Sequence, residues 1–82
     1  MRDEDLLARI LRSARFARKE GYGVLSTGEQ LAAALALNRA DWLAEMDYTI
    51  GQALERLPAD WITTIPDASR ILRDDALKEV TP

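Results

Sequence analysis

Apolar residues recur at every third or fourth position over residues 3–20, which is the spacing of one face of an α-helix. Acidic residues begin this stretch, and Arg18, Lys19 and Gly21 end it, as the helix dipole and helix termination favour. Residues 26–29, Ser-Thr-Gly-Glu, fit a capping box and predict that a second helix begins there. Residues 31–37 are apolar on all sides, so we expect this second helix to lie at the centre of the fold.

One pattern occurs twice, at residues 34–43 and 53–62: Ala-Leu, four further residues, then Ala-Asp-Trp and Leu or Ile. The 19-residue offset is long enough for one helix and one turn. We expect Asn38 to cap a short helix over 39–46 and Pro58 to start another over 58–63. Trp42 and Trp61 then lie one turn into their helices, and both should be largely buried.

Two further helices are predicted. Residues 49–52, Thr-Ile-Gly-Gln, match a second capping box, and the helix over 50–57 should pack through Ile50, Ala53, Leu54 and Leu57. A last helix should begin near Pro66, since proline suits the first turn of a helix, and the tail 79–82 should fray. The expected fold is all-α: one compact domain over residues 1–82 with about five to six short helices.

The centre of the chain invites comparison with a helix-turn-helix. Ala32 occupies the usual small position, but Ala36 stands where the motif has its turn glycine. The helix in the recognition position carries three acidic residues and one arginine, which opposes contact with phosphates. We therefore expect a helix-turn-helix-like packing of helices, beside the 19-residue internal repeat, without DNA reading through this helix.

Composition narrows the chemistry. The 82 residues include no cysteine and no histidine, which excludes disulfides, thiolate or imidazole metal ligands, thiol nucleophiles and a histidine base. The apolar run 31–37 is far shorter than the roughly 20 residues of a membrane span, and the N-terminus is too acidic for a signal peptide. We expect a cytoplasmic protein with no membrane partner, no cofactor, no metal and no enzymatic activity.

Charge is unevenly distributed along the chain. Residues 1–40 hold seven basic and five acidic groups, whereas residues 41–82 hold four basic and nine acidic groups. This segregation fits a basic face docked on the chain's own acidic face, a head-to-tail oligomer, or an acidic surface for a basic partner.

The leading interpretation is a non-catalytic interaction protein of the inhibitor or adaptor type. Its acidic surface, Asp41, Glu45, Asp47 and Glu55, would bind a basic patch on a larger protein, as a DNA mimic does by imitating phosphate spacing. In size and charge the chain resembles small phage-borne inhibitors such as anti-CRISPR proteins, a resemblance of type that rests on no shared motif. The alternative for these acids is that they only keep the surface soluble.

A second interpretation is a helix-turn-helix-like DNA-binding regulator that uses the arginine-rich first helix, in dimeric form. The candidate surface combines one aromatic residue with four cations at helical spacing: Arg9, Arg12, Arg15, Phe16 and Lys19. Two alternatives are a solvated helix face and a surface that forms ion pairs with the acidic half of the chain. A homodimer that pairs this basic face with the acidic face of a second copy is a third.

Overall fold

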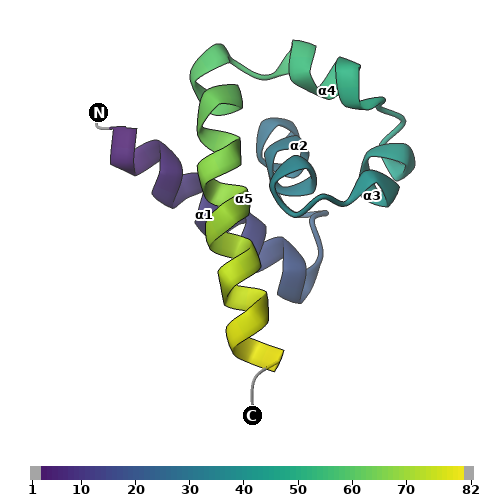
Figure 1. Ribbon diagram of the computed structural model, residues 1–82. Coiled ribbons are helices and arrows are strands. Elements are labelled where there is room, and N and C mark those ends of the chain that lie inside the picture. The colour runs from purple at the N-terminus through teal and green to yellow at the C-terminus, as the bar shows by residue number, and fades with distance from the viewer. Residues whose placement is uncertain (1–2, 81–82) are drawn as a thin grey trace.

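The computed structural model describes residues 3–80, and these residues form five helices joined by short turns (Figure 1). The helices are α1 (Asp3–Glu20), α2 (Thr27–Ala36), α3 (Ala40–Glu45), α4 (Ile50–Arg56) and α5 (Ala59–Val80). The Cα radius of gyration is 12.2 Å, close to the roughly 12 Å of a compact chain of this length. The prediction of a compact all-α fold is confirmed over the described residues.

Helix α2 lies at the centre, as predicted, and packs against each of the other four helices (Figure 1). Its buried side chains are small except for one leucine: Leu31, Ala32, Ala33, Ala34 and Ala36. Small side chains let neighbouring helices approach the α2 backbone closely. Both predicted capping boxes are present, at Ser26 before α2 and at Thr49 before α4.

Asn38 ends α2 instead of capping α3, so the prediction of an N-cap at Asn38 is wrong. Its backbone is left-handed, with φ of 59°. The Asn38 N–H donates to the carbonyl of Leu35 (3.1 Å) and the Arg39 N–H to that of Ala34 (2.8 Å), which is the Schellman arrangement. Asparagine suits both roles, and here the end of the longer helix takes it. The turn that the helix-turn-helix comparison placed at Ala36 therefore lies two residues later.

The short helix α3 ends in the same way as α2. Asp47 has φ of 66°, and its N–H donates to the carbonyl of Ala44 (3.0 Å). The Tyr48 N–H donates to the carbonyl of Leu43 at 2.8 Å. Left-handed residues without glycine thus reverse the chain on both sides of α3, which fixes where its side chains point.

Helix α5 is one continuous helix, whereas the sequence predicted one helix over 58–63 and another from Pro66. Pro66 has no N–H to donate, so the usual bond to the carbonyl four residues earlier is missing. Ile65 and Ala68 are buried on either side of the proline, and their packing keeps the helix continuous. The backbone of α5 continues through Val80, into the tail predicted to fray, while residues 81 and 82 lie outside the described residues.

Both Ala-Asp-Trp segments begin a helix, one at the start of α3 and one at the start of α5. In each segment the backbone N–H of the tryptophan donates to the carbonyl of the residue before the alanine. These residues are Arg39 and Pro58, and both distances are 3.1 Å. Trp42 is buried as predicted, with 8% of its surface exposed, but Trp61 is only partly buried. The two tryptophans therefore contribute unequally to the core.

Replacing the two tryptophans should separate their contributions. Trp42→Ala should lower the free energy of unfolding by roughly 3–5 kcal/mol, because it removes a buried aromatic side chain from a small core. Trp61→Ala should cost clearly less, because part of that ring already faces solvent. Urea unfolding followed by circular dichroism measures both, and equal losses would contradict the unequal burial.

The left-handed residue Asn38 allows a second test of the fold. Asn38→Ala should lower the free energy of unfolding by about 1–2 kcal/mol, because alanine has a Cβ and no polar side chain to offset the left-handed backbone. Asn38→Gly removes the same side chain but relieves the backbone, so its stability should stay closer to that of the unmodified chain. If alanine is tolerated as well as glycine in urea unfolding, this turn does not constrain the fold.

Candidate functional site

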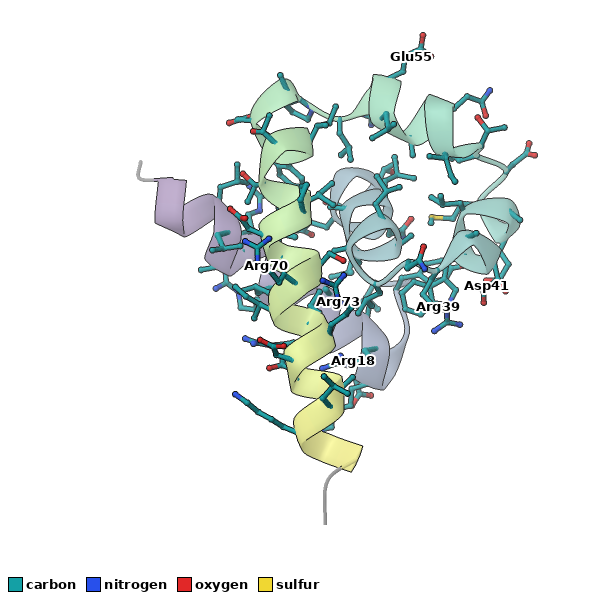
Figure 2. The ribbon with its side chains drawn as sticks, in the orientation of Figure 1. Arg18, Arg39, Asp41, Glu55, Arg70 and Arg73 are labelled. Atoms are coloured by element: carbon teal, nitrogen blue, oxygen red, sulfur yellow. The ribbon has the colours of Figure 1, made fainter. Side chains whose placement is uncertain are left out.

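The four predicted acidic residues do not form one cluster. Asp41 and Glu45 lie on α3, Asp47 in the turn after it, and Glu55 on α4. In Figure 2, Asp41 lies beside α3 while Glu55 projects outward from α4. The acidic surface predicted from the sequence thus divides into an α3 part and an α4 part.

In the α3 part, Asp41 forms a two-point ion pair with Arg39. The Arg39 Nε and Nη2 atoms donate to the two Asp41 oxygens at 3.0 and 2.8 Å. This hydrogen bonding lowers the pKa of Asp41 and raises that of Arg39. The Arg39 guanidinium also lies 4.3 Å from the centre of the Trp42 ring. Much of the charge of Asp41 is therefore balanced inside the chain.

Glu45 is also engaged within the fold. Its carboxylate accepts a hydrogen bond of 2.6 Å from the hydroxyl of Tyr22, which raises the pKa of that tyrosine. The Tyr22 ring contacts Trp42 with centroids 5.1 Å apart and a tilt of 54°. Glu45 thus joins the loop between α1 and α2 to α3, a structural role that the sequence pattern did not reveal.

In the α4 part, Asp47 and Glu55 are exposed, and neither forms an ion pair with a described residue. Both border a shallow depression between the end of α3 and α4, lined by Met46, Asp47, Tyr48, Gln52, Glu55 and Arg56. The structure therefore brings these two predicted residues to one side of the molecule, where their charges face solvent.

Two large apolar side chains of α4 also face solvent. Ile50 is 55% exposed and Leu54 is 39% exposed, although the sequence predicted that both would pack in the core. Only Ala53 and Leu57 are buried from the predicted apolar face, because α4 packs mainly on α2 and α3 and leaves one flank uncovered. Ile50 and Leu54 are one helical turn apart and share that flank.

The predicted basic surface of α1 is partly used inside the chain. Arg9 pairs with Glu29 at 3.2 Å and covers the Trp61 ring at 5.1 Å, and Arg15 pairs with Asp75 at 2.8 Å. Arg12 and Lys19 are exposed and have no ion pair with a described residue, and Phe16 is 41% exposed. Two of the four predicted cations thus hold α1 to α2 and α5.

No family model matches the sequence, and comparisons with curated proteins and with solved structures find no significant similarity. Across residues 3–80, no helix is long and apolar enough to cross a membrane. The same residues bring together no group of three or more side chains of the types that commonly hold a metal ion. The candidate surfaces are therefore judged by their own geometry.

The ion pairs between α1 and α5 predict how stability depends on pH. Hydrogen bonding from Arg15 lowers the pKa of Asp75 below its value in an unfolded chain. The stabilisation is therefore present above the unfolded pKa of an aspartate and is lost as pH falls through the lower pKa of the folded state. Asp75→Asn should lower the urea midpoint at neutral pH and leave it nearly unchanged in acid.

Asp74 offers a matched control, because it is adjacent, exposed and without an ion pair to a described residue. Asp74→Asn should leave the urea midpoint at neutral pH close to that of the unmodified chain. Equal effects of the two substitutions would show that net charge, and not the Arg15 pair, sets the pH dependence.

Proposed function

We propose that this chain is a non-catalytic interaction domain of the cytoplasm that binds a larger protein through its α4 surface. We define the α4 surface as Asp47, Ile50, Leu54 and Glu55. The observation that carries the proposal is the exposure of Ile50 and Leu54 on one flank of α4. The same helix carries the exposed Glu55 and follows the exposed Asp47, and neither carboxylate forms an ion pair with a described residue.

The apolar pair supplies a reason for this helix to be covered. Protein interfaces commonly have an apolar centre and a polar rim, and neighbouring exposed apolar side chains mark such centres. Burying the exposed part of Ile50 and Leu54 in a complex would contribute about 1 kcal/mol for each side chain. An interface needs further contacts, so the partner must reach beyond these two residues.

The charges indicate the chemistry of the partner. Asp47 and Glu55 form no ion pair with a described residue, and the half of the chain that holds them has nine acidic and four basic groups. Such a surface attracts and orients a partner with basic groups. Because Asp41 and Glu45 are held by Arg39 and Tyr22, a mixed apolar and acidic interface is favoured over a row of free carboxylates that mimics phosphates.

The second candidate is nucleic-acid binding through α1. Its support is the exposed Phe16 between Arg12 and Lys19, a combination that can stack on bases and contact phosphates. Only these two of the predicted cations are free of ion pairs with described residues. Basic groups supply most of the affinity for nucleic acid, so this candidate is the weaker one.

Affinity capture from host lysate, with and without nuclease, tests both candidates. If a protein binds through the α4 surface, Leu54→Ser and Glu55→Lys should each reduce the captured amount at least about tenfold, because each removes a contact at the interface. Asp47→Asn removes the other charge and keeps a residue that tolerates a left-handed backbone. Nuclease should not change the capture, and circular dichroism should show that every variant folds.

Asp74→Lys is the matched control for charge, because it makes the same charge reversal at an exposed position of α5. This variant should capture the same amount of protein as the unmodified chain. A captured set that Leu54→Ser and Glu55→Lys leave unchanged would refute the α4 surface. Capture that nuclease removes, together with a salt-sensitive gel shift that Arg12→Ala and Lys19→Ala abolish, would establish the α1 candidate in its place.

A further inference from the structure

A cavity of ≈ 460 Å³ lies between α5, the end of α1 and the turn from α2 to α3. Its lining consists of Arg18, Leu35, Ala36, Leu37, Asn38, Arg39, Ser69, Leu72, Arg73 and Ala76. The volume falls in the range of small-molecule sites, which is about 300–1,000 Å³. Neither predicted surface includes this cavity.

Among the described residues of this lining, every polar side chain can donate a hydrogen bond, and none is a carboxylate. Three arginines from three different elements contribute, and Figure 2 shows Arg18, Arg39 and Arg73 in the same region of the molecule. The depression beside α4 contains Asp47 and Glu55, and a third one, beside Arg15, contains Asp75. Of these three, the arginine-lined cavity alone has only basic charges among its described residues.

Two of the arginines are held in place by neighbouring residues. Arg39 is fixed by Asp41 and by the Trp42 ring. Arg18 lies 3.8 Å from Asp75 and donates to the carbonyl of Leu72 at 3.5 Å.

Arg73 is the arginine best placed to bind a ligand. It is exposed and forms no ion pair with a described residue. Arg73 is not needed to cap the carbonyls of residues 33, 34 and 35 at the end of α2. These carbonyls accept hydrogen bonds from the backbone N–H groups of residues 37, 39 and 38, respectively. The guanidinium of Arg73 is therefore available to an anion, and a planar guanidinium binds carboxylate or phosphate at two points.

We propose that the cavity binds a small molecule made of an apolar body and one anionic group, either a carboxylate or a phosphate. Arg73 binds the anionic group, and Arg39 and Arg18 line the same cavity. The body packs against the apolar lining, Leu35, Leu37 and Leu72. This proposal does not depend on the α4 surface, which lies on other elements.

Binding is tested with naphthyl phosphate and naphthoate as probes, titrated into the isotope-labelled full chain and followed by amide chemical shifts. At least one probe should bind and change the amide chemical shifts of residues 35–39 and 69–76. Arg73→Gln should weaken that binding about tenfold or more, because a hydrogen bond to a charged group is lost. Naphthol has the same body without the anion, and inorganic phosphate the anion without the body, so each should bind more weakly than the best probe.

Arg70→Gln is the matched control, because Arg70 is on the same helix, pairs with Asp67 at 2.6 Å and does not line the cavity. It should leave the affinity within about twofold of that of the unmodified chain. Ala76→Trp, at an exposed position of the lining, should fill the cavity and abolish binding without unfolding the chain. Equal effects of Arg73→Gln and Arg70→Gln, shifts spread over the whole chain, or no binding of either anionic probe would overturn the proposal.

Discussion

The structure depends on burying residues 31–36 of α2, which have no polar side chain to turn toward water. Helix α2 is covered by the other four helices, and four alanines and one leucine form its buried surface. A buried helix must satisfy its terminal backbone groups within the protein, since unpaired groups would cost free energy. Ser26 and Glu29 do this at the beginning of α2, and the left-handed turn at Asn38 does it at the end.

That arrangement determines where charged side chains can act. Ion pairs such as Arg9 with Glu29 and Arg15 with Asp75 lie at the edges of the α1 packing and join α1 to α2 and α5. The basic excess of the first half of the chain is thereby partly used inside the molecule. Asp47 and Glu55 remain exposed at the α4 side and form no ion pair with a described residue.

Local signals predicted the fold where a few neighbouring residues decide the outcome. The capping boxes at Ser26 and Thr49 fall into this class, because their hydrogen bonds span only three residues. The prediction that Asn38 caps α3 was wrong because the short asparagine side chain suits both a helix start and a left-handed helix end. The sequence predicted a helix start at Pro66, whereas the helix continues through it. The burial of Ile65 and Ala68, which holds α5 together, depends on distant partners that local sequence does not reveal.

The functional surfaces could be predicted only in part, for a similar reason. Asp47 and Glu55 were identified from charge alone, but the engagement of Glu45 by Tyr22 needs a loop 23 residues away. The exposure of Ile50 and Leu54 depends on which helices cover α4. The arginine-lined cavity combines residues 18, 39 and 73, and no periodic pattern connects positions so far apart in the chain.

The alanine-rich interior of α2 also bears on how this protein can evolve. At a buried alanine, every other side chain except glycine is larger and must displace a packed neighbour, while glycine weakens the helix. These positions therefore have few neutral substitutions. Exposed positions on α1, α4 and α5 have many, so related chains would diverge on their outer faces while the central helix stays nearly constant.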